Sequence, residues 1–499
     1  MLRRGQDMQW DLLNYHFYNG FSFLEHLGSS SLNPVPVYAS NLNPIPDVLT
    51  YVSDRIAFPI GALFAYAMQI ATVPLIYLLL LNLKKTNYKY KNYDFIRVGS
   101  TLIAVISPIW LSELGTSFPE GWLTSLVILA LWLNLKNLSE FSYSRGLGVG
   151  FSLGLASGLK LTFLIYLAAW AMAILVVTVF SRIEIKHKLK QLSIQYSGAL
   201  LGIGTMSFWY FQVWRRLGNP FFPFYNTLFR SKYFSDTNWK DPRWGFHSLV
   251  GYLKYLRDLW KSTIPETYTS ELSFRDRRID LFLVLLMFFL IWSLLSKKIV
   301  NFNNKEKFLL IFFSISYALW AIFFGLERYG LPNELLWGVL IAIILQNIDL
   351  KYITKCVIIS AIFIISICSI VIPDWGHRPD SFGNSNPFHI SVPKIFTDQP
   401  AVYISNTNAV SYIFPYFSKM SVLETIGDSV GMNIKSILTN AYNISQVKKL
   451  PVRYIIDAGG KSQLATILKN SDLPLSLQNY TCKSYIFDQI APHIFCLEN

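Results

Sequence analysis

The stretch IDLFLVLLMFFLIWSLLS, residues 279–296, is apolar over the length that a helix needs to cross a lipid bilayer. A helix rises about 1.5 Å per residue and takes about 20 apolar residues to cross the hydrocarbon core. Lys297 and Lys298 follow the stretch directly. It therefore predicts a transmembrane helix that ends at a basic loop.

Nine further apolar stretches indicate a polytopic membrane protein. The ten candidate spans are 56–83, 96–113, 119–135, 146–160, 161–181, 191–214, 279–296, 308–325, 331–348 and 356–373. The fourth and fifth share a boundary at Lys160. We therefore expect an all-α bundle of about 10 to 11 transmembrane helices, because each stretch is close to membrane-spanning length.

The composition of the whole chain supports this class. Of the 499 residues, 52% are hydrophobic and 15% are charged, whereas charged residues make up about 25% of a soluble domain. One aqueous core cannot bury so much apolar surface, so a soluble globular protein is excluded. The formal net charge is +14. Lysine and arginine lie mainly between the apolar stretches, which indicates membrane topology and excludes a nucleic-acid partner.

The loops between the stretches alternate in their content of basic residues. One set holds Lys84, Lys85, Lys89, Lys91, Arg97, Arg182, Lys186, Lys188, Lys190, Lys297, Lys298, Lys305 and Lys307. The short connections of the other set hold only Lys160 and Arg328. Because cytoplasmic loops are enriched in lysine and arginine, the first set is predicted to face the cytoplasm. The segments then predicted to lie outside are 1–55, 113–120, 215–278, 326–331 and 374–499.

This topology leaves the N-terminus without a helix to carry it across the membrane. An even number of spans places both termini outside, yet no apolar stretch precedes the first outer loop. Met1 is followed by Leu2, Arg3, Arg4 and polar residues, so no cleavable signal peptide is visible. We therefore expect one further helix upstream of Met1.

Three outer segments are too polar to span a membrane. Residues 8–27 interleave aromatic and polar side chains as an interfacial helix does. Residues 249–260 place apolar side chains at helical spacing opposite charged ones, which predicts a second surface-lying helix. From Asp374 onward, short β-like runs alternate with helical stretches, which predicts a small extracytoplasmic α/β domain. The predicted segments are a first outer loop (1–55), transmembrane helices (56–214), an outer loop (215–278), transmembrane helices (279–373) and the α/β domain (374–499).

The four cysteines fall into two groups. Cys482 and Cys496 lie in the predicted α/β domain on segments that can pair, so we expect a disulfide, with two buried thiols as the alternative. Cys356 and Cys368 lie in the last apolar stretch and are interpreted as packing residues. The sequence has no CxxC motif and no Cys/His cluster, which excludes a zinc site and a redox motif.

Charged residues that could carry chemistry gather at the predicted outer ends of the spans. They are Asp7, Asp11, Glu113, Glu120, Lys160, Glu327 and Arg328. The apolar stretches hold almost no ionisable residue at mid-depth, where ion-coupled transporters place theirs. We expect the outer turns to surround a cavity at the membrane boundary, which suits chemistry on a lipid-linked anionic substrate.

A sugar attached to a polyprenyl phosphate would fit such a cavity. Its departing phosphate leaves negative charge that needs a basic side chain, for which Arg328 and Lys160 are the candidates. The attacking hydroxyl of the acceptor needs a carboxylate as general base, for which Asp11 and Asp7 are the candidates. A single displacement would invert the anomeric configuration. Further substrate-binding candidates are Glu327, Glu113, Glu120 and His16.

Each candidate also has a structural alternative. Asp7 and Asp11 could cap a helix or be solvated. Glu113 and Glu120 could be solvated turn residues or first-turn acids. The alternatives for the remaining candidates are an ion pair between Glu327 and Arg328, a Lys160 that extends to the interface, and a hydrogen-bonding His16. The glycines at 146, 148, 150, 154 and 158 are interpreted as a helix-packing surface and not as a phosphate-binding loop.

Several motifs occur in a familiar order along the chain. They are GQDMQWDLLNYHFYNGFSFL (5–24), NLNPIPDVLTY (41–51), TSFPEGW (116–122), SGLKLTFLIY (157–166), GNPFFPFYNTLFRS (218–231) with KDPRW (240–244), and ERYGLP (327–332). This set resembles the GT-C superfamily of bacterial integral-membrane glycosyltransferases, of the glycosyltransferase family 87-like kind, over residues 5–332. The resemblance implies about eleven helices, an outer active site, a polyprenyl-phosphate-linked sugar donor and an acid in the first outer loop, here Asp11 or Asp7.

The sequence departs from the superfamily pattern in two respects. The helix that should precede the first loop is absent, and Asp7 and Asp11 are four residues apart where two adjacent acids are common. Some branches use a divalent cation, Mg²⁺ or Mn²⁺, for which Glu113 and Asp7 offer oxygen ligands, but the sequence does not require one. Which of the two aspartates is the base stays open.

The sequence thus predicts a membrane glycosyltransferase of the bacterial inner membrane. It would move a sugar from a polyprenyl phosphate to an envelope glycan, lipid or protein acceptor. The alternative is a flippase or transporter of lipid-linked glycans, which shares many helices and a basic cavity. A third possibility is an assembly partner in envelope biogenesis, in which the outer carboxylates would be dispensable.

Overall fold

The computed structural model describes most of the chain as two compact units. The described residues are 5–25, 30–56, 60–83, 94–181, 184–239, 241, 243–258, 269–297, 300–378, 386–427, 431–457, 459–488, 490 and 492–498. One unit comprises Met1–Ala65, Phe208–Lys240 and Gly376–Asn499, and the other comprises Tyr66–Ser207 and Asp241–Trp375. We call them the sheet unit and the helical unit. Predicted features that fall outside the described residues are Lys84, Lys85, Lys89, Lys91, Arg182, Lys298, Leu259 and Trp260.

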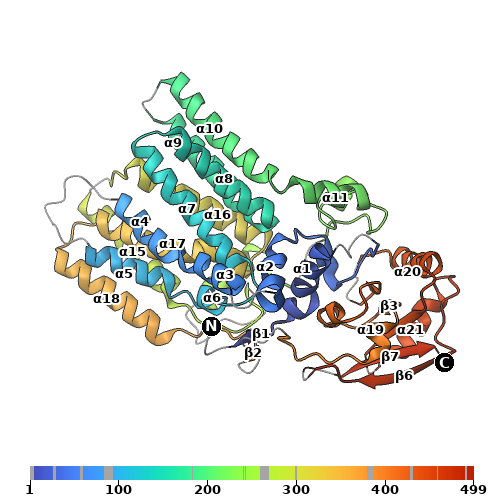
Figure 1. Ribbon diagram of the computed structural model, residues 1–499. Helices are drawn as coiled ribbons and strands as arrows, with labels where there is room; N and C mark the ends of the chain where they lie inside the picture. Colours follow the sequence, from blue (N-terminus) through green and yellow to red (C-terminus); the bar gives the residue numbers. More distant parts are fainter. Residues whose placement is uncertain are drawn as a thin grey trace. The chain divides into compact units, whose positions relative to one another are not determined.

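The helical unit is a bundle of helices (Figure 1). Its elements are α4 (Thr72–Asn82), α5 (Asp94–Val105), α6 (Pro108–Ser112), α7 (Glu120–Ser139), α8 (Tyr143–Leu159), η5 (Leu161–Phe163), α9 (Leu164–Val179), α10 (Ile185–Gly204), α13 (Leu249–Asp258), α15 (Arg277–Ser296), α16 (Asn304–Phe323), η6 (Glu327–Gly330), α17 (Leu331–Asn347) and α18 (Tyr352–Ser369), and α3 (Ile60–Ile70) crosses the boundary between the units. Six helical stretches of the described chain are long and apolar enough to cross a membrane: α7, η5 with α9, α15, α16, η6 with α17, and α18. The predicted multi-pass architecture is confirmed.

Three of the predicted spans are broken helices. Span 56–83 divides into α3 and α4 at Ala71. Span 96–113 divides at Ser107, whose side chain accepts a hydrogen bond from the Trp110 N–H before Pro108 opens α6, because proline cannot continue a helix from the preceding turn. Span 191–214 ends as α10 at Gly204, and a separate helix, α11 (Ser207–Leu217), follows with two arginines in its last turn. Such charge density does not suit a membrane span.

Helices α8 and α10 pack with their backbones in close contact, and Figure 1 draws them side by side. A Cβ atom at Gly150 would lie 1.9 Å from the carbonyl oxygen of Gln195, and one at Gly154 would lie 2.2 Å from that of Ala199. A Cβ at Gly198 of α10 would meet an α8 carbonyl oxygen at 2.2 Å. The predicted helix-packing role is confirmed for Gly150 and Gly154, whereas a Cβ at Gly148 would meet only Leu133, at 3.6 Å.

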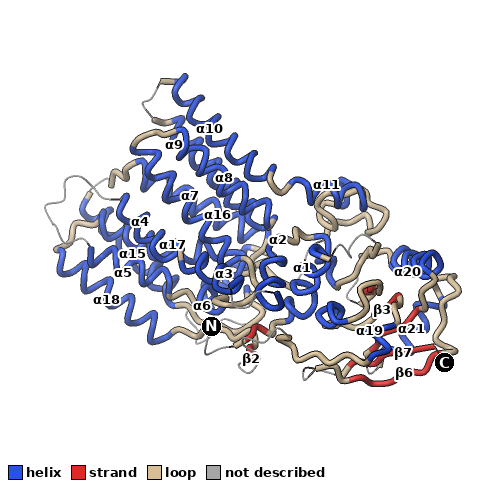
Figure 2. Tube along the Cα trace, in the orientation of Figure 1, coloured by secondary structure: helices blue, strands red, loops and turns tan. Residues whose placement is uncertain are grey.

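The sheet unit contains the predicted α/β domain, whose strands are red in Figure 2. Its five-stranded sheet has the order β4-β3-β5-β7-β6, with β3 parallel to β4 and β5, and β7 antiparallel to β5 and β6. The strands are β3 (Val402–Ser405), β4 (Val422–Thr425), β5 (Val452–Ile456), β6 (Tyr480–Tyr485) and β7 (His493–Glu498), and the helices are α19 (Lys394–Asp398), η8 (Ser411–Tyr416), α20 (Ile434–Lys448) and α21 (Gly460–Lys469). The predicted fold class, a helical membrane protein with a C-terminal α/β region, is confirmed.

The N-terminal segment is an integral part of the sheet unit. It forms β1 (Gln6–Asp7), η1 (Leu12–His16), α1 (Phe17–Leu24), η3 (Pro36–Asn41), α2 (Ile45–Tyr51) and η4 (Val52–Ile56), and β1 pairs with β2 (His377–Arg378). The predicted interfacial helix at 8–27 is buried here instead, since Leu12, Phe17 and Phe21 join one hydrophobic core with Tyr403 of the sheet. The aromatic residues of this segment, which were expected at a membrane interface, pack on other aromatic residues of the same unit.

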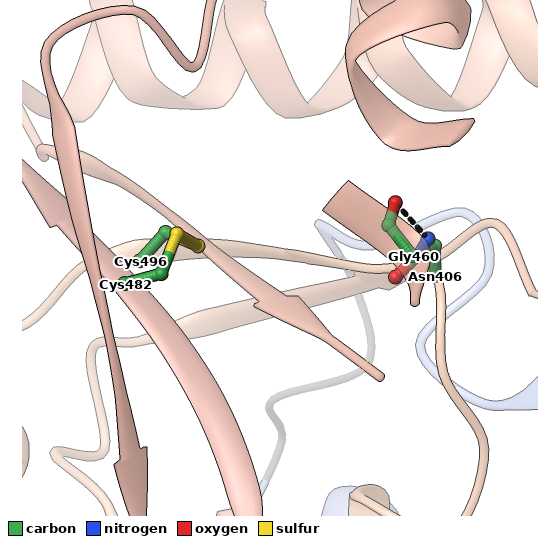
Figure 3. The surroundings of a disulfide bond; sticks show 4 residues. All are labelled: Asn406, Gly460, Cys482 and Cys496. Carbon is green, nitrogen blue, oxygen red and sulfur yellow. Dashed lines mark hydrogen bonds between the residues drawn. A yellow bond between two sulfur atoms is a disulfide. The ribbon is translucent and has the colours of Figure 1, made fainter. Parts of the chain in front are cut away.

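Cys482 and Cys496 form the predicted disulfide, which links directly opposite residues of β6 and β7 (Figure 3). Cys356 on α18 is partly buried, whereas Cys368 is exposed, so the packing role expected for Cys368 is not seen. The predicted amphipathic helix at 249–260 is present as α13, and it exposes Leu249 and Leu253.

Candidate functional site

The turn between α6 and α7 buries two carboxylates of the helical unit. Glu113 follows α6, Glu120 begins α7, and neither side chain is exposed. The alternative that they are solvated turn residues is therefore wrong. Glu120 does stand in the first turn of α7, where the helix dipole favours a negative charge. Two neighbouring carboxyl groups that are buried away from water need nearby cations or a bound proton to offset their negative charge.

Lys160 supplies one of the cations. It lies between α8 and η5 with an extended backbone, which ends the first helix and directs the side chain toward the turn. Its Nζ donates to Oε1 of Glu120 at 2.5 Å and lies 5.3 Å from the ring centroid of Tyr329. Lys160 therefore does not extend to the interface without a partner. The pair holds an ammonium group against an aromatic face.

Arg328 supplies the second cation from the short helix η6. Its guanidinium carbon lies 4.5 Å from the ring centroid of Phe118, which is in edge contact with Trp375. Its Nη2 donates to Oε1 of Glu271 at 3.0 Å. Glu327, the neighbour in sequence, instead accepts a hydrogen bond from the Tyr255 hydroxyl at 3.0 Å. The simple alternative, that Glu327 and Arg328 pair with each other, is therefore wrong.

Glu113 lies within electrostatic reach of the other three charged groups. Burial raises the pKa of Glu113 well above its usual value, and the charge of Glu120 raises it further. Arg328, Lys160 and the Gly121 N–H oppose this rise in the pKa. We call Glu113, Glu120, Lys160 and Arg328 the turn cluster. Glu120 and Glu271 each pair with one of the two cations, and the raised pKa of Glu113 limits the further negative charge that this carboxyl adds beside them.

A second buried network, which the sequence did not suggest, is built around Arg278 at the start of α15. The Arg278 guanidinium bonds to the carboxylate of Asp276 and, at 2.6 Å, to Oε2 of Glu334 in α17. It also donates to the carbonyl oxygens of Ile103 and Ala104, which lie in the last turn of α5. Arg278 is thus the link between the ends of three helices. The feature of the sequence that could have indicated this network is the group of acidic and basic residues beside an apolar span.

Asp7 and Asp11, the predicted bases, lie in the sheet unit. Asp7 ends β1 and is buried, and its Oδ1 accepts the Gln9 N–H at 3.1 Å. Asp11 occupies the N-cap position of η1 but makes no capping hydrogen bond with its side chain. The capping alternative for Asp11 is therefore wrong. The adjacent Trp10 is exposed, so this segment reaches the surface of the unit.

His16 is a buried hydrogen-bonding residue of the same unit. Its Nδ1 lies 2.5 Å from Oδ1 of Asp47, and the other oxygen of Asp47 accepts from the Asn19 side chain at 2.8 Å. The carboxylate thus fixes the orientation of the imidazole ring. The hydrogen-bonding alternative describes this arrangement, although the environment is a protein core and not a membrane interface.

Asp54 is an acid near Asp7 that sequence reasoning missed. It lies in η4 and is buried. Burial raises the pKa of Asp54 to about 8, the charge of Asp7 adds to the rise, and a hydrogen bond from Gln6 opposes it. At neutral pH Asp54 therefore holds a proton next to Asp7, an arrangement that two close carboxyl groups commonly adopt.

We expect Asp54→Asn to change how stability depends on pH. A carboxyl whose pKa is higher in the folded chain stabilises the fold while both states are protonated, below about pH 4, and this contribution is lost as the pH rises toward 8. The variant should match the parent near pH 4 and exceed its melting temperature at pH 8. Thermal unfolding of the detergent-solubilised proteins at both values would check this. If the melting temperatures of both proteins fell equally between the two pH values, the raised pKa of Asp54 would be contradicted.

A divalent cation finds little support in the side chains present. Among the described residues, no group of three or more His, Cys, Asp or Glu is placed to hold a metal ion. Glu113 and Asp7, the two ligands considered from the sequence, belong to different units. Glu113 also has Lys160 and Arg328 as neighbours, and their positive charges disfavour a metal cation there.

Comparison with known proteins shows a shared fold. No family model and no curated protein matches the chain. The crystal structure of ArnT from Cupriavidus metallidurans bound to undecaprenyl phosphate is similar, with a TM-score of 0.54 and 11% identity over 99% of this chain and 94% of ArnT. The apo structure of ArnT gives a TM-score of 0.52 with the same identity and coverage. The chain therefore has an ArnT-like fold over almost its whole length.

Proposed function

We propose that the protein is a GT-C-type glycosyltransferase that takes a sugar from a polyprenyl-phosphate donor and transfers it to an acceptor of the cell envelope. The observation that carries this proposal is the turn cluster, which holds two cations on aromatic ring faces at the end of a membrane-spanning bundle. The ArnT-like fold supports it, because ArnT was crystallised with undecaprenyl phosphate. Chemistry of this kind needs a positive site for a lipid-linked phosphate.

In this proposal Lys160 and Arg328 bind the phosphate of the donor. An arginine presents several N–H groups to phosphate oxygens, and a lysine adds a point charge. Glu120 orients the Lys160 ammonium through its hydrogen bond. Because burial raises the pKa of Glu113, this carboxyl adds less negative charge beside the two cations, which can then stabilise the departing phosphate as its charge develops.

The general base is proposed to be Asp11 or Asp7. The acceptor hydroxyl gives its proton to the carboxylate while its oxygen bonds to the anomeric carbon. The bond from that carbon to the phosphate oxygen breaks, and the electron pair leaves with the polyprenyl phosphate. One displacement of this type inverts the anomeric configuration. The resemblance to GT-C enzymes supports the choice of these aspartates, both of which lie in the first predicted outer loop.

The proposed orientation places the chemistry and the α/β domain outside the cytoplasm, at the bacterial inner membrane. The disulfide between Cys482 and Cys496 supports this side, because disulfides persist in oxidising compartments. The basic loops predicted to face the cytoplasm support it independently.

Replacing the base should slow transfer. We expect Asp11→Asn to lower turnover at least tenfold, or about 1.4 kcal/mol in the barrier, because the amide cannot accept the proton. The measurement is release of free polyprenyl phosphate by the purified protein with a panel of polyprenyl-phosphate sugars. Asp7→Asn is the parallel variant. Transfer at the parent rate by both variants would show that neither aspartate is the base.

A further inference from the structure

Helix α11 of the sheet unit has two distinct faces. One face is fixed to its own unit: Val213 and Leu217 are buried in a small core with Phe222, and the Trp209 indole donates to the carbonyl oxygen of Asn41 at 3.1 Å. The other face presents Phe208, Phe211 and Trp214 at intervals of three residues, with exposed fractions of 40%, 53% and 53%. Three large aromatic side chains on one exposed helix face need a partner that is not water.

The loop after α11 extends this surface. Helix α12 (Asn226–Phe229) exposes Leu228, and Tyr225 before it is exposed as well. Ring contacts join the two elements, since Phe221 lies 5.6 Å from Tyr210 of α11 and 6.4 Å from Tyr225 between ring centroids. We call the exposed set of Phe208, Phe211, Trp214, Tyr225 and Leu228, with the cations Arg215, Arg230 and Lys232, the aromatic-basic face.

The charge on this surface is mainly positive. Residues 205–235 contain four arginines and lysines and no aspartate or glutamate, and the exposed Asp236 is the first acid that follows. Arg215, Arg230 and Lys232 are exposed, and no ion pair with a described residue engages them. The positive-inside bias does not explain them, because this region is predicted to lie on the outer side, where such residues are few. Their complement is therefore an anionic partner.

The chain connection limits where that partner can be. Only Thr205 and Met206 separate the end of α10 from the start of α11, so α11 begins within about 10 Å of the end of α10. The last turns of α10 expose the apolar side chains of Leu200 and Leu201. Aromatic side chains with interspersed cations are typical of helices that lie at the boundary between lipid tails and headgroups.

We propose that the aromatic-basic face binds the surface of a bilayer that contains anionic lipid headgroups. Phe208, Phe211 and Trp214 enter the boundary of the acyl chains, and the three cations contact lipid phosphates. The second part of the span predicted at 191–214 is then an interfacial helix. This inference concerns a lipid surface and does not depend on the proposed reaction.

A fluorescent label on α11 tests the proposal in the full chain. The variant Phe211→Cys, in a background of Cys356→Ser and Cys368→Ser, carries a bimane dye in vesicles of phosphatidylcholine alone or mixed equally with phosphatidylglycerol. Aqueous iodide and nitroxide-labelled lipid serve as the two quenchers. Ala465→Cys on α21 is the matched control, because that position is also exposed in the sheet unit. Phe208→Cys replaces Phe211→Cys if the latter does not fold.

We expect the lipid nitroxide to quench the dye on α11, and phosphatidylglycerol to increase this quenching and reduce quenching by iodide. The dye on α21 should respond to iodide only. The triple variant Arg215→Gln, Arg230→Gln, Lys232→Gln should lose the difference between the two vesicles. Equal iodide quenching at both positions would overturn the proposal. Lipid quenching that is the same with and without phosphatidylglycerol would overturn the anionic headgroup as the partner.

Discussion

Alanine at position 150 should destabilise the protein severely, whereas alanine at position 148 should leave it as stable as the parent or slightly more so. The added Cβ at Gly150 would lie 1.9 Å from the carbonyl oxygen of Gln195 and 2.5 Å from the backbone nitrogen of Ala199. Backbone atoms cannot rotate away as side chains do, so α8 and α10 must separate. The expected loss is about 3 kcal/mol or more, at the upper end of what overpacking costs.

Gly148 is the matched control in the same helix. A Cβ there meets only the Leu133 Cδ1 atom at 3.6 Å, which is ordinary contact. The intrinsic helix preference of alanine over glycine, up to about 1 kcal/mol, then acts alone and favours the variant. Thermal unfolding in detergent would compare Gly150→Ala, Gly148→Ala and the parent. Size-exclusion chromatography of each protein before heating would show whether it is monodisperse. Equal melting temperatures for the two variants would refute the close approach of α8 and α10.

Hydropathy located the membrane helices because spanning length depends on local composition. The stretches 119–135 and 279–296 became α7 and α15 with small changes at their ends. Hydropathy does not locate the breaks within the three broken spans, because a break depends on the backbone at single residues and not on the average composition of the stretch. Pro108 after the capping Ser107 is visible in the sequence, but the end of α10 at Gly204 and the start of a separate α11 depend on how α11 packs in its own unit.

The turn cluster was partly accessible to sequence reasoning. Lys160, Glu120 and Arg328 were selected because they stand at span ends, where a charge can remain near water. Which acid pairs with which cation depends on the packing of α7, α8 and η6, and the sequence does not encode these distances locally. The partner of Arg328, Glu271, lies before α15, and the partner of Glu327, Tyr255, lies in α13, so both are far from η6 in sequence and were missed.

Buried ionisable groups in unpatterned segments escaped sequence analysis altogether. Asp54 stands next to Arg55 and could be taken for a solvated residue, yet the fold buries it near Asp7. Arg278 follows another arginine, and only the convergence of α5, α15 and α17 makes it the buried member of the pair. Burial of a charge is a property of tertiary structure, and composition alone cannot predict it.

Removing either cation of the turn cluster should abolish most of the proposed transferase activity. Loss of one positioned charge partner at a reacting group typically costs about 100-fold in turnover, and we expect this for Lys160→Gln and for Arg328→Ala. Because both cations would stabilise the same developing phosphate charge, the double variant should lose less than the product of the single effects. Release of free polyprenyl phosphate under saturating donor is the measurement.

The kinetic pattern separates a role in the reaction from a role in the fold. Removal of Lys160 leaves the buried Glu120 without its cation, so Lys160→Arg, which keeps the charge, should recover part of kcat while Lys160→Gln does not. If the cations bind the donor and the transition state equally, KM rises and kcat is kept; if they act on the departing phosphate, kcat falls. Lys419→Gln, at an exposed surface pair with Glu25, is the control that should leave both constants unchanged. Parent kinetics in a folded Arg328→Ala variant would make Arg328 a structural residue, held between Phe118 and Glu271 for packing alone.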